Sequence, residues 1–162
     1  GFMTTIHAFT SDQRILDNSH KDPRRARSAS QSIVPTSTGA SKAIGEIIPQ
    51  LKNKLEGIAM RVPIPNVSLI ELVFLTKRKL TIDLINQAFK NASKNELNGV
   101  LEITNEKLVS VDFNHNQASS IVDGSLTNVI GTNMGKISSW YDNEWGFSNR
   151  MCDTAVAMKR SK

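Results

Sequence analysis

The sequence predicts an α+β domain in which two to three helices are layered on one mostly antiparallel sheet. Apolar residues recur at helical spacing over 40–48 and 84–92, while short strand-like runs fill much of the remaining chain. Gly, Asn and Asp separate these runs, as in an antiparallel meander. We expect a single domain over 1–162, because no internal repeat and no Pro/Gly/Ser-rich linker divides the chain.

The first third of the chain combines a strand, a loop and a helix. Residues 2–10 are rich in Thr, Ile and Phe and are predicted to form a strand. Residues 11–33 are polar, charged and aperiodic, which predicts a long loop, and loops of that length in compact domains are usually functional. The helix that follows is expected to start with Ser37 or Thr38 as its cap and to stop at Pro49.

Two strands and a second helix are expected next. Residues 57–62 alternate in polarity, and residues 67–76 are almost continuously apolar, which is typical of a strand covered on both faces. The second helix is capped by Thr81. Its predicted buried stripe consists of Leu84, Ile85, Ala88, Phe89 and Ala92.

The last third is predicted to hold short strands and a tail helix. The strands are expected at 99–103, 109–113, 120–123, 127–130 and 136–140. The tail helix is expected over 144–159. Its apolar side would carry Phe147, Met151, Ala155 and Met158.

Composition narrows the class of protein. With 39% hydrophobic and 22% charged residues the chain has enough apolar material for a core. No apolar run approaches the roughly 20 residues of a membrane span, so no membrane partner is expected. A single cysteine, Cys152, leaves no disulfide framework or CxxC metal site; it favours a reducing compartment, and we expect a cytoplasmic protein without a metal.

The net charge of +5 allows a nucleic-acid binder as one hypothesis. The basic residues cluster only in 21–27, through Lys21, Arg24, Arg25 and Arg27. A cluster this local favours a small anion or an ion-paired loop, so no nucleic-acid partner is expected.

Two features near the start of the chain have both a structural and a chemical interpretation. His7 lies within a strand-like run, where it is either a structural residue or a general base. Ser37, Thr38 and Gly39 precede a helix, where they either cap it or offer hydroxyls and free N–H groups to a small anion.

Two further features have the same ambiguity. Any of the arginines at 24, 25, 27 and 61 can bind a phosphate through two parallel hydrogen bonds, but Arg61 lies in an apolar strand and needs either an ion-pair partner or a ligand. In the aromatic segment 138–147, Asn143 either faces a flat ligand or caps the tail helix, and in the structural interpretation Trp140 and Trp145 fill the core.

Five segments of the chain, in order, resemble the glyceraldehyde-3-phosphate dehydrogenase family. They are 3–8, 22–27, 35–43, 59–63 with 66–68, and 139–144, and the segment 143–151 resembles bacterial members. The resemblance covers essentially the whole chain. It implies the fold of that family's C-terminal catalytic and substrate-binding domain, with the Rossmann domain absent from the chain.

The resemblance also implies roles for individual residues. His7 matches the catalytic histidine that partners a cysteine and assists hydride transfer, and Asn143 matches the residue that orients the nicotinamide carboxamide. The positions implied for the C3 phosphate of the substrate are Thr10, Asp12, Arg25 and Arg61, and those for inorganic phosphate are Thr38 and Gly39. The loop 11–33 matches an S-shaped loop that lines a neighbouring subunit's cofactor site, which implies a homo-oligomer, a tetramer in the family.

The reaction that the resemblance implies is the glycolytic oxidation of glyceraldehyde 3-phosphate. A cysteine thiolate adds to the aldehyde, hydride leaves for NAD or NADP, and inorganic phosphate attacks the remaining thioester to give an acyl phosphate. The family's Ser-Cys-Thr-Thr-Asn-Cys stretch and a GxGxxG motif are both absent from these residues, and Cys152 is expected to be a core or surface thiol. We therefore expect a fragment that is inactive alone and binds no cofactor, with 144–159 packing on the missing N-terminal domain and apolar surface exposed without it.

Three alternatives stay open at this point. Asn18 and Ser19 stand where strictly NAD-dependent members carry Leu-Pro and NADP-using photosynthetic members carry a small residue and Ser, so the choice between NAD and NADP is undecided. The segment 109–115 also resembles erythrose-4-phosphate dehydrogenases. One hypothesis is therefore that this chain is half of such an enzyme. The other is a standalone, non-catalytic binding or assembly domain of the same fold.

Overall fold

The computed structural model describes residues 1–160, except for the side chains of residues 41 and 42. Within that part of the chain the strands are β1 (Phe2–Ala8), β2 (Val34–Ser37), β3 (Glu56–Val62), β4 (Ser68–Leu75), β5 (Leu101–Thr104), β6 (Ser120–Asp123), β7 (Asn128–Ile130) and β8 (Met134–Tyr141). The α-helices are α1 (Ala40–Ile47), α2 (Ile82–Lys94) and α3 (Trp145–Arg160). Short 3₁₀ helices are η1 (Pro49–Leu51), η2 (Ser110–Phe113) and η3 (Gly124–Leu126).

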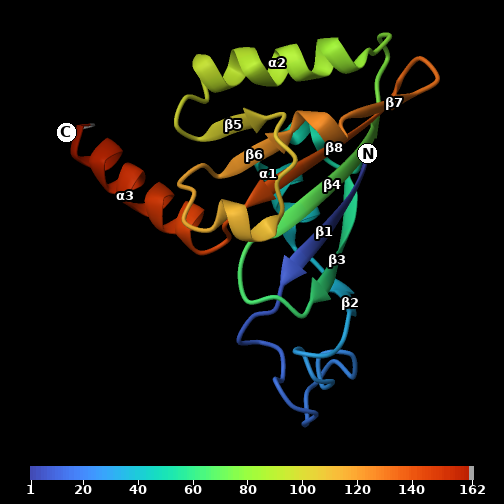
Figure 1. Cartoon of the computed structure of the whole chain (residues 1–162), viewed down its shortest axis with the longest axis vertical. Coiled ribbons are helices and arrows are strands. Elements are labelled where there is room, and N and C mark those ends of the chain that lie inside the picture. The colour runs from blue at the N-terminus through green and yellow to red at the C-terminus, as the bar shows by residue number, and fades with distance from the viewer. Residues whose placement is uncertain (161–162) are drawn as a thin grey trace.

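The strands form one sheet in the order β2-β3-β1-β4-β8-β6-β5, and β7 pairs with β8 (Figure 1). The pairs β1–β3 and β5–β6 are parallel, while the others are antiparallel. This architecture confirms the predicted α+β class with a mostly antiparallel sheet and three helices.

The topology brings five strand ends together. β1 and β3 are parallel and both finish there, at Ala8 and Val62. β4 starts beside them with Ser68, which pairs with Tyr141 at the end of β8, and β2 starts with Val34 opposite Arg61. We call this edge the site end of the sheet, and the loop 9–33 extends from it at the bottom of Figure 1.

A buried apolar cluster stabilises the sheet close to the site end. It consists of Val67, Phe113, Ala118 and Ile121, with Leu108 and Trp140 packed against it. The Trp140 ring stacks on Phe113 with 5.2 Å between ring centroids, and its indole N–H donates to Asp123 at 3.2 Å. Trp140 therefore fills the core, whereas Trp145 is 45% exposed.

The second helix is capped as predicted, since the Thr81 hydroxyl accepts a hydrogen bond from the Leu84 N–H at 3.1 Å. The predicted stripe is wrong for two of its members: Leu84 is 55% exposed and Ala88 is exposed, while Ile85 is buried. The buried face is rotated toward Asn86, whose amide donates to the Gly124 carbonyl and accepts from the Thr127 hydroxyl. The hydrogen bonds of Asn86 therefore replace the apolar contacts that the periodicity predicted on this face of α2.

Two strand predictions also need correction. Residues 109–113 are not a strand, because the Asp112 carboxylate accepts from the Val109 N–H at 2.8 Å and closes η2. β4 is not covered on both faces: Val73 and Leu75 are 39% and 66% exposed, on the face where Glu71 pairs with Lys136 at 2.9 Å. The edge strand β2 had not been predicted, and its Pro35 is compatible only with such an edge.

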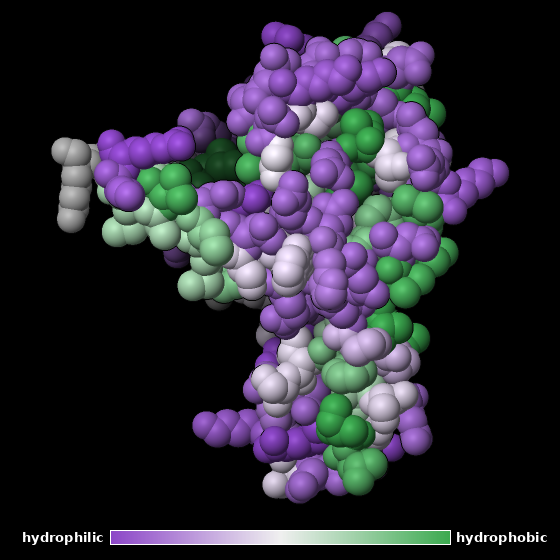
Figure 2. Space-filling model, turned by 60° about the vertical axis from the view of Figure 1, so that its left-hand side comes forward, coloured by the Kyte–Doolittle hydropathy of each residue, from purple (hydrophilic) through white to green (hydrophobic). Residues whose placement is uncertain are grey.

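The tail helix α3 projects from the body of the molecule, and its apolar residues form a green surface on the projection in Figure 2. Phe147, Met151 and Met158 are 67%, 59% and 67% exposed, so the expected exposure of this face is confirmed. Among residues 1–160 we find no helix that combines the length and apolar character needed to cross a membrane.

Candidate functional site

The site end brings His7 and Arg61 into direct contact. They are partners in the parallel register of β1 and β3, one residue before each strand ends. The Arg61 Nη1 atom lies 2.5 Å from His7 Nδ1 and donates to the Ala8 carbonyl at 3.0 Å, and His7 Nδ1 is itself 2.7 Å from that carbonyl. His7 and Arg61 are 54 positions apart in the sequence, and the structure makes them one polar unit.

The surroundings of His7 favour its neutral form. Burial lowers the pKa of His7 and the Arg61 guanidinium lowers it further, and these effects outweigh the Ala8 carbonyl and Glu144, which raise it. The Tyr141 ring lies edge-on to the imidazole at 5.9 Å, and the Tyr141 hydroxyl shares a 3.0 Å hydrogen bond with Thr5. A neutral imidazole held in this way is suited to accept a proton near pH 7.

Arg61 has no carboxylate partner: the ion pairs found among the described residues do not include it. Burial lowers the pKa of Arg61, although a guanidinium stays protonated in proteins. A charge in an apolar strand is predicted to have an ion-pair partner or a ligand. In the structure, Arg61 contacts only the Ala8 carbonyl and the His7 imidazole. Arg61 therefore retains positive charge that an anion can neutralise.

A buried serine connects the same strand ends to Asn143. The Ala8 N–H donates to Ser68 Oγ at 3.1 Å, and the Ser68 hydroxyl donates to Asn143 Oδ1 at 3.2 Å. Ser68 is 1% exposed. The amide of Asn143 is thus oriented through the peptide that follows His7, and Ser68 is a site residue that sequence analysis did not single out.

Asp142 is the anchor of the segment that carries Asn143. It is 1% exposed, and its carboxylate accepts from the Asn66 amide and from the N–H groups of His115, Glu144 and Trp145 at 2.8–3.0 Å. Desolvation raises the pKa of Asp142, but these hydrogen bonds together bring it below its ordinary value. The carboxylate of Asp142, not the amide of Asn143, therefore holds the start of α3, which leaves Asn143 for another role.

The backbone at Val67 is unusual for a β-branched residue, with φ of 63°. Val67 is fully buried in the apolar cluster and lies between Asn66, which is bound to Asp142, and Ser68. A left-handed valine costs on the order of 1–3 kcal/mol, so packing and hydrogen bonds must maintain it. Strain of this kind is concentrated beside the residues that position Asn143.

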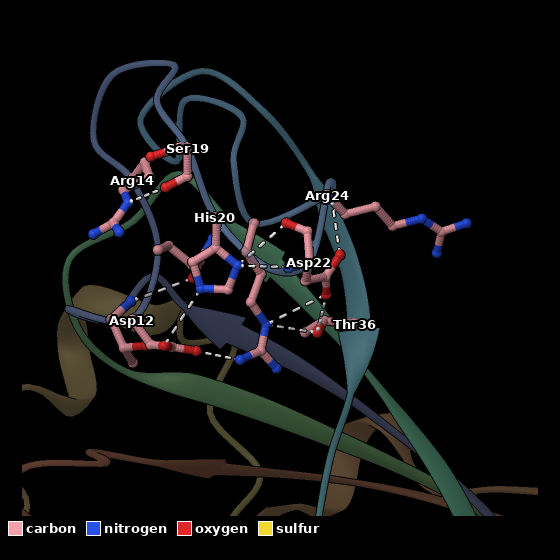
Figure 3. Close-up of polar contacts among 10 residues, drawn as sticks. Asp12, Arg14, Ser19, His20, Asp22, Arg24 and Thr36 are labelled. Carbon is pink, nitrogen blue, oxygen red and sulfur yellow. Dashed lines mark hydrogen bonds and ion pairs between the residues drawn. The ribbon is translucent and has the colours of Figure 1, made fainter.

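The loop 9–33 places Arg25 in a different setting, among polar partners of which Asp12, Asp22 and Thr36 are labelled in Figure 3. Arg25 is paired with Asp12, lies 3.6 Å from Asp22, and donates to the Thr36 hydroxyl on β2 at 2.9 Å. His20 lies beside the same carboxylate, with its Nε2 atom 3.6 Å from Asp12. The structure therefore brings Arg25 and Asp12 together as an ion pair, and Arg25 ties the loop to the sheet through Thr36.

The loop also contains Thr10 and Arg27, which have other partners than this pair. Thr10 makes a backbone turn with Gln13, whose N–H donates to the Thr10 carbonyl at 2.9 Å. Desolvation raises the pKa of Asp12, but hydrogen bonds from His20 and Arg25 lower it below its ordinary value, so the carboxylate stays ionised. Arg27 is likewise paired with Asp17 at 3.2 Å, so two residues of the basic cluster, Arg25 and Arg27, are ion-paired within the loop.

Thr38 and Gly39 lie at the start of α1, away from Arg61. Gly39 is the N-cap, and the Thr38 hydroxyl accepts from the Ala40 N–H at 3.2 Å, so neither Ser37 nor Thr38 is the cap that was predicted. Because Val34 is opposite Arg61 and β2 runs away from it, Thr38 lies about 13 Å further along. An anion bound at the amino end of α1 and an anion bound at Arg61 would therefore occupy two separate sites.

The only cysteine, Cys152, is exposed on α3, in agreement with a surface thiol. The hollows on the surface beside α3 and beside η1 are lined by other residues than those above. A third hollow is lined by residues of the loop and of β2 and β3, namely Asp22, Arg24, Pro35, Thr36, Ser37, Gly57 and Ile58. The candidate site is the end of the sheet that carries the Arg61 cation, the His7 imidazole and the oriented amide of Asn143.

Known proteins are similar to this chain over most of its length. A family model described as glyceraldehyde 3-phosphate dehydrogenase, C-terminal domain, matches residues 1–143. The chain is 56% identical over 155 residues to the chloroplastic glyceraldehyde-3-phosphate dehydrogenase A of Zea mays, which covers 96% of this chain and 38% of the maize protein. It is 52% identical over 162 residues to the chromosomal glyceraldehyde-3-phosphate dehydrogenase of Cupriavidus necator, covering 100% of this chain and 48% of that protein.

A further relative, the glyceraldehyde-3-phosphate dehydrogenase of Cereibacter sphaeroides, is 54% identical over 160 residues, which are 99% of this chain and 48% of the relative. The chain thus spans about half the length of the curated bacterial relatives that it matches.

Proposed function

The chain belongs to the glyceraldehyde-3-phosphate dehydrogenase family, and we propose that it forms the substrate- and phosphate-binding half of an enzyme that oxidises glyceraldehyde 3-phosphate to an acyl phosphate. The observation that carries the proposal is the contact between Arg61 and His7 at the site end. It places a cation suited to a phosphate beside an imidazole suited to move a proton. Neither residue has a carboxylate partner among the ion pairs described here.

His7 is the proton-transfer residue in this proposal. Its lowered pKa keeps the ring neutral near pH 7, where it accepts the proton of a thiol or of the hydroxyl formed when a thiolate adds to the aldehyde. The nucleophilic cysteine would be supplied by the other half of the enzyme, because Cys152 lies exposed on α3. The chain alone is therefore proposed to be inactive.

The phosphates of the reaction would occupy two positions. The C3 phosphate of the substrate binds Arg61, with Thr10, Asp12 and Arg25 around it, and inorganic phosphate binds Thr38 and Gly39 at the start of α1. Arg61 is the main ligand in this scheme, since the charge of Arg25 is already shared with Asp12 and Asp22. The backbone N–H groups at the start of α1 favour the second anion.

Asn143 would be the residue of this chain that contacts the dinucleotide. Its Oδ1 atom is occupied by Ser68, and its Nδ2 atom makes one long contact, 3.4 Å to Glu144, which leaves donor capacity at a partly buried position. That geometry fits the carboxamide of NAD or NADP. When bound, the dinucleotide supplies the hydride acceptor. Asn143 orients the carboxamide, and Ser68 and Asp142 hold Asn143.

The proposal includes an assembly. The exposed apolar face of α3 would pack on the dinucleotide-binding domain, and the loop 9–33 would contact a neighbouring subunit in a homotetramer. A cytoplasmic location stays a prediction from the single cysteine. The alternatives are half of an erythrose-4-phosphate dehydrogenase and a non-catalytic assembly module of the same fold.

Reconstitution tests the proposal. The chain is mixed with a dinucleotide-binding half that carries the cysteine, and the reduction of NAD or NADP is followed with glyceraldehyde 3-phosphate and inorganic phosphate. We expect no turnover from either half, turnover from the mixture, and a loss of roughly 100-fold or more with His7→Asn.

Three controls separate the alternatives. Replacing the triose with erythrose 4-phosphate distinguishes the two substrates by their kcat/KM values. Lys77→Ala, in the turn after β4, should leave turnover unchanged. A folded chain that binds the second half without turnover would favour the assembly module and contradict the proposal.

A further inference from the structure

The turn between α2 and β5 contains an Asn-Gly pair that lies outside the candidate site. The Val100 N–H donates to the Leu97 carbonyl at 3.0 Å and closes a four-residue turn with Asn98 and Gly99 at its centre. Gly99 has a φ of 77°, whereas Asn98 does not have a positive φ, so the turn is of type II. Such a turn favours glycine at this position, because a side chain would be strained there.

The two groups that react with each other in an Asn-Gly pair are both accessible here. Asn98 and Gly99 are exposed, and within the described part of the chain nothing beyond the adjacent residues lies within 4 Å of where a Cβ on Gly99 would stand. Among the hydrogen bonds of residues 1–160, none involves the Asn98 side chain or the Gly99 N–H. The amide is therefore free to rotate, and the backbone nitrogen has no partner to give up.

An exposed asparagine amide reacts with the backbone nitrogen that follows it, which makes asparagine a thermally labile residue. The Gly99 nitrogen forms a bond to Asn98 Cγ, while the side-chain nitrogen takes up the proton that Gly99 loses and leaves as ammonia. Water then opens the cyclic imide at one of its two carbonyls. The product is aspartate or isoaspartate, and in isoaspartate the main chain passes through Cβ and Cγ and is longer by one carbon atom.

Glycine favours ring closure at this turn. In a type II turn the ψ of Asn98 is about 120°, so the peptide has to rotate before the Gly99 nitrogen reaches Cγ. Glycine permits that rotation, because it has no Cβ and adopts both signs of φ readily. Asn95, in the same segment, lacks this freedom, because Glu96 carries a Cβ and the Asn95 amide donates to the Asn91 carbonyl at 2.8 Å.

The turn also receives a contact from the tail helix. Arg150 of α3 donates from Nη1 to the Gly99 carbonyl at 3.1 Å and to Ser119 Oγ at 3.4 Å. An isoaspartate directly before Gly99 lengthens the main chain, so the Gly99 carbonyl is displaced from Arg150. Modification of the turn therefore weakens one attachment of α3 to the body of the molecule.

We propose that Asn98 is a site of spontaneous deamidation, with water as the other reactant, and that the isoaspartate product loosens α3. The inference does not depend on the proposed function, since it uses neither His7 nor Arg61. It makes the turn an ageing site of the chain, where one exposed amide becomes a carboxylate and the net charge falls by one from +5.

Peptide mapping of the aged chain tests the site. The purified chain is incubated at mildly alkaline pH and digested with trypsin at intervals, and the peptide 95–107 is analysed by mass spectrometry that distinguishes aspartate from isoaspartate. We expect Asn98 to be modified at least about tenfold faster than Asn95, because glycine does not obstruct ring closure. Equal rates at the two positions would overturn the proposal.

Hydrogen exchange tests the effect on α3. The modified chain is separated by ion exchange on its added negative charge, and the fraction that contains isoaspartate is compared with the fresh chain. We expect the amides of α3 to exchange several-fold faster in that fraction, because one attachment of the helix is lost. Unchanged exchange in α3 would overturn the link between the turn and the helix.

Two variants serve as controls for the exchange measurement. Asn98→Gln, incubated for the same time, should exchange like the fresh chain, because its longer side chain does not form the five-membered imide. Arg150→Met lacks the contact to Gly99 from the start and should show faster exchange in α3 without ageing. If Asn98→Gln loosened on incubation as the unsubstituted chain does, the loosening would come from another change and the proposal would fail.

Discussion

The site end of the sheet and the loop 9–33 each contain an arginine and an aspartate, but the two regions use them in opposite ways. In the loop, Arg25 is paired with Asp12, and the Asp12 side chain is 60% exposed. At the site end, Asp142 is 1% exposed and bonded only to neutral N–H groups and an amide, while Arg61 contacts only neutral groups.

The difference shows how charge is divided between structure and function. In the loop, opposite charges neutralise each other and hold an irregular segment on β2. At the site end, the carboxylate of Asp142 stabilises the turn before α3 by accepting hydrogen bonds. The positive charge of Arg61 remains available to a ligand. Substitutions in the two regions should therefore have very different effects.

The largest effect is expected from Asp142→Ala. Removal of this carboxylate leaves several N–H donors without a partner in a buried turn, and we expect the free energy of unfolding to fall by about 3 kcal/mol. Urea unfolding followed by Trp fluorescence measures the change. Asp12→Ala is the matched control from the loop, and an equal loss in both variants would remove the contrast between the regions.

The next effect concerns phosphate affinity. Arg61→Ala should weaken binding of a phosphorylated substrate or analogue by roughly 10- to 100-fold, because it removes charge-assisted hydrogen bonds. Arg25→Ala should weaken it by only a few-fold, since the charge of Arg25 is already paired. Isothermal titration at low salt compares the two. If Arg25→Ala caused the greater loss, the loop and not the strand end would hold the anion.

The smallest effect is the pH dependence due to His7. Its pKa in the folded chain lies below the ordinary value of 6.5, so between the two values the unfolded chain binds more protons. Stability should therefore fall as pH decreases through about 6.5 toward the pKa of the folded state, and His7→Gln should flatten that part of the curve. Thermal unfolding across this range measures it. A decline of the same slope in His7→Gln would assign the effect to other groups.

The cap of α2 and the presence of the tail helix were predictable from local patterns. Thr81 caps α2 and the tail helix forms, because hydroxyl capping and apolar spacing act within one or two turns of chain. The buried stripe of α2 was predicted wrongly because partners distant in sequence decided the outcome. Asn86 replaces Leu84 and Ala88 on the buried face of α2 because Gly124 and Thr127 lie opposite it.

The candidate site divides in the same way. The sequence alone determined the residue types of the site, since His7, Arg61 and Asn143 are recognisable as a base, a cation and an amide within their motifs. Only the tertiary structure decided that Arg61 rests on His7, that Ser68 bridges Ala8 to Asn143, and that Arg25 is neutralised by Asp12. The physical reason is that hydrogen bonds and ion pairs depend on distances of a few ångströms. These distances are set where β1, β3 and β8 end and β4 begins, at the same edge of the sheet.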